Sequence, residues 1–329
     1  MKNVLITGGA GYIGSIMTRQ LLDKGYKVVV VDDLSNGEVK ALDERAKFKR
    51  LDLGDSKNVQ QLFQINNFEA VLHFAGVISM AESMADPAKY FRINTFNTLN
   101  LLEAMVRHGA DKIIFSSSAG VYGNPEKIPI PETHKTNPTN PYGESKLAVE
   151  NILSWYDKIF GIKSVSLRYF NAAGASTDGK LGENHKSETH IIPLAIRAVL
   201  TDTEFALFGD DYNTDDGTCV RDYIHVEDLC NAHLLALNSL LERGNSAIYN
   251  VGTGVGYSNK DIVSHVEKIS GKKLKIMMMG RRAGDSDTLV SDPSKIKTEL
   301  GWKPKYSNPQ IIIETAWKYH SYKHYENRD

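Results

Sequence analysis

Asn3–Gly14 reads NVLITGGAGYIG, an aliphatic run that leads directly into a segment with four glycines in seven residues. Ile16–Lys24 continues with helical spacing and stops at Gly25. A strand that enters a helix through a glycine-rich turn presents backbone N–H groups at the helix N-terminus, where a pyrophosphate can bind. After a second strand-like run, Lys27–Val31, Asp32 stands about 20 residues on, where a carboxylate binds a ribose. The stretch therefore predicts a dinucleotide-binding strand–helix–strand unit.

The residue after Asp32 distinguishes between the two nicotinamide dinucleotides. It is Asp33, not Arg or Lys, so the 2′-phosphate of NADP would meet two negative charges. We therefore predict NAD as the cofactor. The alternative interpretation is a plain turn followed by a solvated acidic pair.

Strand and helix patterns keep alternating through the first half of the chain. Strand patterns cover Ala70–Phe74, Lys112–Ser116 and Lys163–Tyr169. Helical patterns between them cover Asn58–Asn66, Asn94–His108 and Tyr142–Phe160. This alternation predicts a parallel sheet covered on both faces. With right-handed crossovers, the fold class is α/β, a doubly wound parallel sheet of the Rossmann type.

The regular alternation of strand and helix patterns ends after about residue 172. Asn171–Glu188 is rich in Gly, Ser, Thr and Asp, which indicates a loop that leaves the sheet. We expect residues 1–172 to form the NAD-binding domain, with segments returning from about 220–255. Residues 173–329 are expected to form a smaller, irregular α/β lobe that binds the substrate.

The composition excludes several classes of function. The 329 residues exceed the usual size of one hydrophobic core, which favours two lobes. A formal net charge of −1 gives no electrostatic case for a nucleic-acid partner. We expect no membrane partner and a cytoplasmic protein, because no run of about 18 apolar residues and no signal-peptide core are present. Cys219 and Cys230 lack metal-ligand spacing, so no metal is expected.

A second chemical signal is the YGESK string at Tyr142–Lys146. Tyr142 and Lys146 are four residues apart, so they share one face of a helix. A phenol titrates near 10 in water, whereas a general base should titrate nearer the working pH. A neighbouring ammonium and a positive nicotinamide ring would both favour the phenolate. Ser116–Ser118 stands upstream at a strand end, where ligands bind in such sheets, so we predict an acid/base site here.

The glycine motif, the Tyr-x-x-x-Lys pair and the upstream serine together resemble the short-chain dehydrogenase/reductases of extended type. Further strings narrow the resemblance to the UDP-galactose 4-epimerases, and they follow the family's order over nearly the whole chain. They are TGGAGYIGS (Thr7–Ser15), HFAG (His73–Gly76), FSSSAGVYG (Phe115–Gly123), PYGESK (Pro141–Lys146), RYFN (Arg168–Asn171), VRDYIHV (Val220–Val226), YNVGTG (Tyr249–Gly254) and RRAGD (Arg281–Asp285).

The resemblance implies a role for each matching residue. Tyr142 would exchange a proton with the sugar 4-hydroxyl, Lys146 would lower the pKa of Tyr142 and hold the nicotinamide ribose, and Ser118 would hydrogen-bond the same hydroxyl. The residues expected to bind NAD are Gly8, Gly11, Tyr12, Ile13, Gly14, Asp32, Asp33, Asn36, Asp52, Leu53, Phe74, Ala75, Asn94, Ser116, Tyr142, Lys146 and Phe170. Those expected to bind the UDP-hexose are Ser118, Tyr142, Asn171, His190, Ile191, Phe208, Arg221, Arg282, Asp285 and Leu289. For Phe208 and Ile191, packing in the core is the favoured interpretation.

The implied activity is an isomerisation that interconverts UDP-galactose and UDP-glucose. The sugar is oxidised at C4 by NAD, the 4-keto sugar turns its other face, and it is reduced again. One alternative is a UDP-sugar dehydratase or decarboxylase of the same family, but those carry an acidic residue beside the catalytic serine or threonine, and Ser118 precedes Ala119 and Gly120. A non-catalytic NAD-sensing scaffold is another, but such proteins typically lack the Tyr/Lys pair. The third alternative is a plain dehydrogenase with net turnover, which steady release of NADH would reveal.

Two expectations concern assembly and substrate range. The helical patterns Asn94–His108 and Tyr142–Phe160 are apolar over more than one face, and the resembled epimerases dimerise through such a helix pair, so we predict a homodimer. In that family, a bulky residue a few positions after Arg-x-Gly-Asp restricts the enzyme to the UDP-glucose pair. Leu289 occupies this position, so we also expect UDP-GalNAc and UDP-GlcNAc to be accepted. Packing of Leu289 within the second lobe is the alternative.

Overall fold

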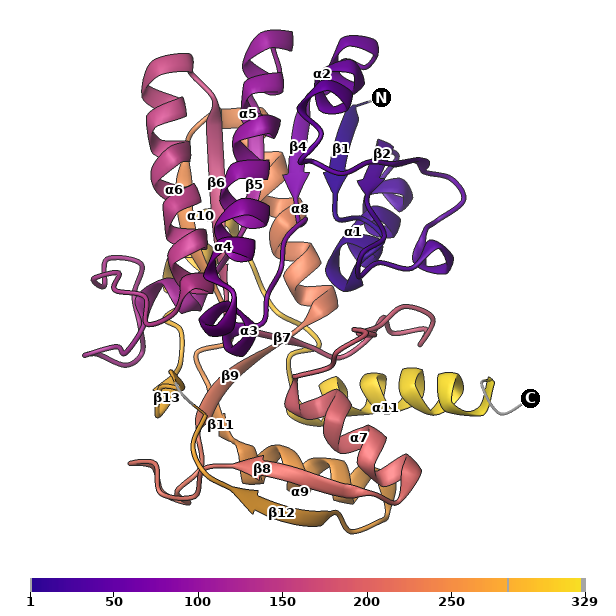
Figure 1. Ribbon diagram of the computed structural model, residues 1–329, viewed down its shortest axis with the longest axis vertical. Helices are drawn as coiled ribbons and strands as arrows, with labels where there is room; N and C mark the ends of the chain where they lie inside the picture. Colours follow the sequence, from indigo (N-terminus) through magenta and orange to yellow (C-terminus); the bar gives the residue numbers. More distant parts are fainter. Residues whose placement is uncertain (1, 283, 327–329) are drawn as a thin grey trace.

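Short runs of aliphatic residues form a seven-stranded sheet at the centre of the larger lobe (Figure 1). The computed structural model describes residues 2–282 and 284–326. In spatial order the strands are β10 (Ala247–Val251), β6 (Lys163–Tyr169), β5 (Lys112–Ser118), β4 (Ala70–His73), β1 (Asn3–Thr7), β2 (Lys27–Asp32) and β3 (Lys47–Arg50). Every neighbouring pair is parallel. The chain order reverses between β1 and β4, which creates the crevice where ligands bind in such sheets.

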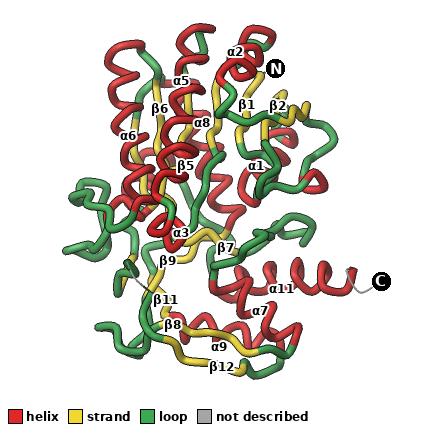
Figure 2. The backbone as a smooth tube through the Cα atoms, in the orientation of Figure 1, coloured by secondary structure: helices red, strands yellow, loops and turns green. Residues whose placement is uncertain are grey.

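Helices cover both faces of this sheet, as Figures 1 and 2 show. On one face, α1 (Tyr12–Asp23) and α8 (Val226–Arg243) share a buried apolar cluster with the strands. On the other face, a second cluster joins α2 (Ser56–Ile65), α5 (Asn97–His108) and α6 (Pro141–Phe160). Both faces of the inner strands are buried, which explains their nearly continuous apolar sequences, whereas the edge strand β3 is mostly exposed and polar. The predicted doubly wound α/β class is confirmed.

The smaller lobe is built around β9 (Val220–His225). Its other elements are β7 (Asn171–Ala173), β8 (Glu204–Phe208), β11 (Gly256–Ser258), β12 (Lys275–Met279), β13 (Thr288–Leu289), α7 (Ile191–Thr201), α9 (Asn259–Ser270) and α11 (Pro309–Glu326). The helix α10 (Ser294–Leu300) instead packs on α8 and β10 of the larger lobe. Strands β7, β11 and β13 all pair with β9, whereas β8 pairs with β12. A third apolar cluster is formed mainly by α7, α9 and α11.

The structure differs from the expected elements in three places. The helix expected to begin at Asn94 is a π-helical turn at Phe91–Phe96 followed by α5, because a 3.6-residue periodicity does not reveal one extra residue in a turn. Two short helices, α3 (Met80–Ala85) and α4 (Pro87–Tyr90), precede this turn. The expected loop after Asn171 begins with the three residues of β7.

The domain boundary near residue 172 stays an expectation, although β10 does return to the first sheet. Ala283, inside the RRAGD string, lies outside the described residues. Within residues 2–282 and 284–326, no helix is both long and apolar enough to cross a membrane.

Candidate active site

The glycines after β1 form a tight cradle at the N-terminus of α1. Gly8 has φ +72°, and a Cβ there would lie 2.6 Å from the backbone nitrogen of Ala75. A Cβ on Gly14 would lie 2.2 Å from the carbonyl oxygen of Gly8. At Gly11 the contact is a looser 3.3 Å. The lack of a Cβ at Gly8 and Gly14 thus lets the turn close, and Gly11 leaves its backbone open to a bound group. A pyrophosphate requires such a close approach to the backbone.

Asp32 ends β2 beside this cradle. Its carboxylate accepts hydrogen bonds from the backbone N–H groups of Ala10, at 3.0 Å, and Leu34, at 2.8 Å. Burial raises the pKa of Asp32, and these two bonds oppose the rise. The side chain of Asp33 points into the next turn and accepts from the N–H of Ser35. Both carboxylates therefore suit a ribose that carries free hydroxyls.

The other expected NAD residues gather along one edge of the sheet, because the carboxyl ends of parallel strands lie together. Tyr12 and Ile13 begin α1. The remaining residues end or follow strands β2 to β6. They are Asn36, Asp52, Leu53, Phe74, Ala75, Ser116 and Phe170. The Leu53 side chain belongs to the apolar core. The Phe74 ring packs against His233, with ring centroids 4.8 Å apart.

Asn94 is buried in the π-helical turn and fixes the loop after β4. Its amide oxygen accepts from the N–H of Val77 at 2.9 Å, and its amide nitrogen donates to the Val77 carbonyl at 3.0 Å. The same nitrogen donates to the Ser145 hydroxyl at 2.9 Å. In this structure Asn94 therefore ties the loop after β4 to α6.

The start of α6 places Tyr142 and Lys146 at the edge of the sheet. Asn140 caps the helix by accepting from the N–H of Gly143, and Pro141 occupies the first turn. One turn on, the Lys146 ammonium donates to the Ser116 carbonyl at 2.9 Å. Burial lowers the pKa of Lys146 to about 8. The helix therefore delivers both residues of the predicted pair to the end of β5.

The phenol of Tyr142 does not gain its expected acidity from the protein alone. Burial raises the pKa of Tyr142, and a hydrogen bond with Ser118 opposes the rise. The expected effect of Lys146 on this pKa stays a prediction; in the structure its ammonium donates to the Ser116 carbonyl. The Ser118 hydroxyl also accepts from the N–H of Gly120 at 3.0 Å, which fixes its position.

Strand β9 brings together one group of the expected substrate residues. Asn171 of β7 pairs with Tyr223, and Leu289 of β13 pairs with Arg221. Arg221 is 8% exposed, and its guanidinium lies 3.7 Å from the Asp285 carboxylate. The half-buried Leu289 side chain packs against an apolar cluster that includes Ala119 and Phe170. Leu289 therefore packs against this cluster rather than only within the second lobe.

A second group of expected substrate residues forms where α7 begins. The Arg282 guanidinium lies 4.0 Å from the centre of the half-buried Phe208 ring and 3.5 Å from the Thr189 carbonyl. His190 precedes α7, and its Nδ1 contacts the Glu183 carboxylate. This carboxylate raises the pKa of His190 to about 9. Ile191 packs on the core of the smaller lobe, as favoured from the sequence.

Two arrangements were not predicted from the sequence. His73 is buried between the Thr7 and Thr98 hydroxyls, at 2.6 and 2.8 Å, and ties β1 to α5. A cluster of two glutamates and two histidines lies before α7, with the sequence pattern Glu-x-His-x-x-Glu-x-His over residues 183–190. That spacing was the signal that could have revealed the cluster.

A sequence model for the NAD dependent epimerase/dehydratase family matches residues 4–252. The chain belongs to this family. Its similarity to members of the family extends over the whole length of both chains. A UDP-glucose 4-epimerase of Lacticaseibacillus casei is 48% identical over 96% of each chain.

Two solved structures illustrate the likeness in three dimensions. The UDP-glucose 4-epimerase of Bifidobacterium longum, in complex with NAD⁺ and UDP, is 37% identical with a TM-score of 0.94 and covers 98% of this chain and 99% of its own. The UDP-Glc/GlcNAc 4-epimerase of Campylobacter jejuni is 41% identical with a TM-score of 0.85 and covers 98% of this chain and 100% of its own. The membership therefore rests on both sequence and fold.

Proposed function

We propose that this protein is a UDP-glucose 4-epimerase, an isomerase that interconverts UDP-galactose and UDP-glucose with NAD as its cofactor. The observation that carries the proposal is the convergence of Tyr142, Lys146 and Ser118 at the carboxyl end of β5, beside the glycine cradle of α1. The full-length similarity to UDP-glucose 4-epimerases supports the same activity.

In the proposed reaction Tyr142 accepts the proton of the sugar 4-hydroxyl and later returns it to the same oxygen, once hydride has been returned to the opposite face of C4. Ser118, which hydrogen-bonds Tyr142, holds the same sugar oxygen. Lys146 is positioned by the Ser116 carbonyl to hold the nicotinamide ribose. When bound, NAD⁺ supplies the hydride acceptor and, after the sugar has turned, the hydride donor. The sugar therefore undergoes no net oxidation, and NAD should remain bound between turnovers.

The UDP part of the substrate would be held by the residues around β9 and α7. Arg221 and Arg282 can each give a phosphate two parallel, charge-assisted hydrogen bonds. In the structure these guanidinium groups already lie close to Asp285 and Phe208. Asn171 and His190 complete the proposed grip. Binding energy at this distance from C4 anchors the nucleotide and leaves the sugar room to turn.

We also propose that the enzyme accepts UDP-GalNAc and UDP-GlcNAc. The half-buried Leu289 side chain lies against the Ala119–Phe170 cluster, next to the serine that would hold the sugar. Leucine is smaller than tyrosine and leaves room on that side. The C. jejuni relative, a UDP-Glc/GlcNAc 4-epimerase, agrees with such breadth in a close structural neighbour.

Two copies of the chain are proposed to associate through α5 and α6. Leu153 and Met105 of these helices are buried against the sheet, but Phe96, Trp155 and Ile159 are 54%, 60% and 64% exposed. Aromatic side chains of this size are rarely left exposed together unless a partner covers them. An isologous homodimer would bury the exposed side of both helices.

The proposed activity is tested by incubating the purified protein, without added NAD, with UDP-galactose and separately with UDP-GalNAc. The products are then separated and identified. UDP-glucose should form from UDP-galactose, and NADH should not accumulate. Steady release of NADH would favour a dehydrogenase, whereas loss of water or CO₂ from the sugar would favour the dehydratase or decarboxylase alternative. The absence of any product despite bound NAD would favour a non-catalytic scaffold.

A further inference from the structure

Four side chains that the proposed reaction does not use as acid or base converge in the loop before α7. They are Glu183, His185, Glu188 and His190, and one potential ligand atom from each lies within 4.8 Å of all the others. Glu183 is 3% exposed, and the side chain of Glu188 is 6% exposed. Two buried carboxylates in contact require compensating positive charge.

The two distances from Nδ1 of His185 to the glutamates are close to the edges of a tetrahedral metal site, whereas Nδ1 of His190 is in direct contact with Glu183. Nδ1 of His185 lies 3.3 Å from Glu183 Oε1 and 3.6 Å from Glu188 Oε2. Nδ1 of His190 lies 3.8 Å from Glu188 Oε1 and also contacts Glu183 Oε1. Ligands at about 2.0–2.1 Å from a tetrahedral zinc ion lie about 3.3–3.4 Å from one another. An ion between the four side chains would therefore replace the direct contact of His190 with Glu183, and the side chains would have to rotate apart to admit it.

We propose that Glu183, His185, Glu188 and His190 form a structural Zn²⁺ site. Neutral imidazole nitrogens together with carboxylate oxygens suit zinc, whereas magnesium and calcium prefer oxygen ligands alone. With neutral histidines, the two carboxylates give the site a charge of −2, which one divalent cation balances. The proposal departs from the expectation, drawn from the cysteine spacing, that no metal is bound.

A network of ion pairs with protonated histidines is the competing interpretation. The rings of His185 and His190 are 5.8 Å apart, centre to centre. The Glu183 carboxylate raises the pKa of His190 to about 9, so a protonated His190 would balance one of the two carboxylates. One zinc ion would balance both carboxylates and bind both rings.

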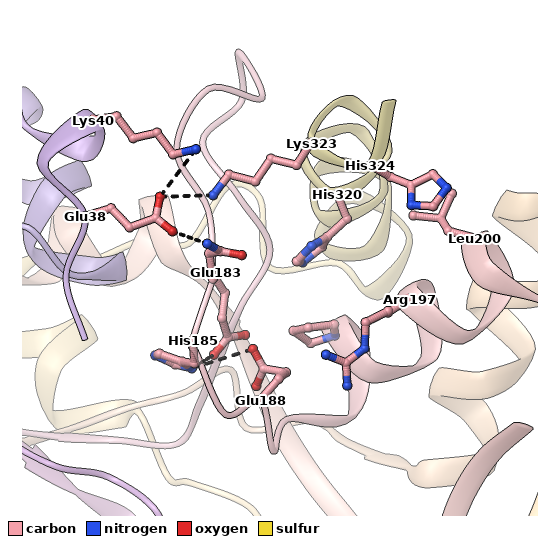
Figure 3. A pocket seen from close by; sticks show the side chains of 12 residues that line it. Glu38, Lys40, Glu183, His185, Glu188, Arg197, Leu200, His320, Lys323 and His324 are labelled. Atoms are coloured by element: carbon pink, nitrogen blue, oxygen red, sulfur yellow. Dashed lines mark hydrogen bonds and ion pairs between the residues drawn. The ribbon is translucent and has the colours of Figure 1, made fainter. Parts of the chain in front are cut away.

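The cluster lies at the wall of a pocket, which gives an ion a route from solvent (Figure 3). Glu183, His185 and Glu188 line this pocket, and His320 of α11 lines it as well. In Figure 3, dashed lines join His185 to the two glutamates at one end of the pocket, away from Lys323. Lys323 pairs with Glu38 at 3.2 Å. Three of the four proposed ligands therefore lie at the end of the pocket away from Lys323, and Arg197 lines the pocket as well.

Zinc at this position would fasten the loop that joins the two lobes. Asn184, between two of the ligands, donates to the Glu38 carboxylate. Lys186, also between ligands, donates to the Ser35 carbonyl at 2.5 Å. Both acceptors follow β2, in the segment that carries the proposed adenosine-side residues Asp33 and Asn36. The metal would therefore stabilise the contact between the loop and this segment, and it would also fix His190 of the proposed UDP grip.

Cobalt(II) is the probe for the test, because its visible absorption bands are strong in four-coordinate sites and weak in six-coordinate ones. Untagged protein with its bound NAD is freed of metal with a chelator and titrated with Co²⁺. We expect one Co²⁺ per chain, strong bands, and their loss on addition of Zn²⁺. At a zinc concentration 100 times the Kd, the ratio of folded to unfolded protein should rise about a hundredfold, measured by urea unfolding.

Two variants and a matched control decide where the ion binds. His185→Gln and Glu183→Gln each remove one ligand and should weaken Co²⁺ binding at least about tenfold. His265→Gln removes a histidine of α9, outside the cluster, and should bind as the wild type does. Each zinc effect is measured against the same variant without metal, so a change in basal stability does not enter. Weak bands, no binding, or equal binding by His185→Gln and the wild type would overturn the proposal.

Discussion

At the scale of single residues, the phenol of Tyr142 is the group on which the proposed reaction depends. Burial raises its pKa in the protein, and only the hydrogen bond with Ser118 opposes that rise. The buried Lys146, whose pKa is about 8, donates to a backbone carbonyl. The positive nicotinamide of NAD⁺ is therefore the additional charge that would favour the phenolate.

Replacing Tyr142 with Phe tests this assignment. The variant keeps the ring and removes the proton acceptor, so NAD should still bind while epimerisation falls by at least about a hundredfold. The rate is measured by conversion of UDP-galactose to UDP-glucose, and bound NAD is measured after denaturation of the purified variant. Tyr90→Phe is a control, because the Tyr90 ring packs edge-on against Tyr142 and its hydroxyl bonds to Glu82. Near-normal turnover by Tyr142→Phe would rule the assignment out.

Leu289 is the residue proposed to set the range of substrates. In a Leu289→Tyr variant the larger ring should fill the space beside Ala119 and Phe170 that an acetamido group needs. We expect kcat/KM for UDP-GalNAc to fall at least about tenfold, with little change for UDP-galactose. The ratio of the two values is the measurement. A wild type that ignores UDP-GalNAc, or a variant with an unchanged ratio, would contradict this role.

At the scale of elements, α5 and α6 each use one side for the sheet and leave another side exposed. Light scattering at micromolar concentration should give about twice the chain mass of 36.6 kDa. Trp155→Glu combined with Ile159→Glu should produce the single-chain mass, because two charges would then have to be buried at the interface. Met277→Glu, at an exposed position of β12, is the control and should leave the mass unchanged. A single-chain mass for the wild type would refute the dimer.

At the scale of the whole molecule, buried histidines should set the response of stability to acid. Burial lowers the pKa of His73 to about 3 and, with largely the same cause, those of His225 and His233 to about 4. His233 shows why the ring stays neutral: its Nδ1 donates to the Leu229 carbonyl, and its Nε2 contacts the Tyr169 hydroxyl. Below about pH 6.5 the histidines of the unfolded chain bind protons, whereas these three histidines stay neutral in the folded protein.

The free energy of unfolding should therefore fall as the pH is lowered from about 6.5 towards 4. The unfolded state binds more protons in this range, so stability increases with pH and is complete above about 6.5. A histidine with a folded pKa near 4 accounts for about 2 kcal/mol of the loss at pH 5. His233→Gln should lose about 2 kcal/mol less than the wild type between pH 7.5 and 5, measured by urea unfolding. Equal losses in both proteins would show that His233 is not responsible.

Local sequence determined the chemistry of the two motifs that lie on single strand–helix units. The glycines after β1, Asp32, and the Tyr142–Lys146 pair each depend on neighbours within a few turns of the chain, so their arrangement follows from spacing. The same holds for β1 and β6, whose bounds match the apolar runs Asn3–Thr7 and Lys163–Tyr169. The doubly wound sheet then follows from the alternation of strands and helices.

Tertiary structure decided what depends on contacts between distant parts of the chain. Leu289 reaches the Ala119–Phe170 cluster only because β13 pairs with β9, and Asn94 fixes the loop after β4 only because a π-helical turn directs it towards Val77. The raised pKa of Tyr142 and the neutrality of His73 arise from burial, which no local pattern specifies. Short-range periodicity fixes which residues share a face of one element, but only the packed fold fixes which faces meet and how much water they exclude.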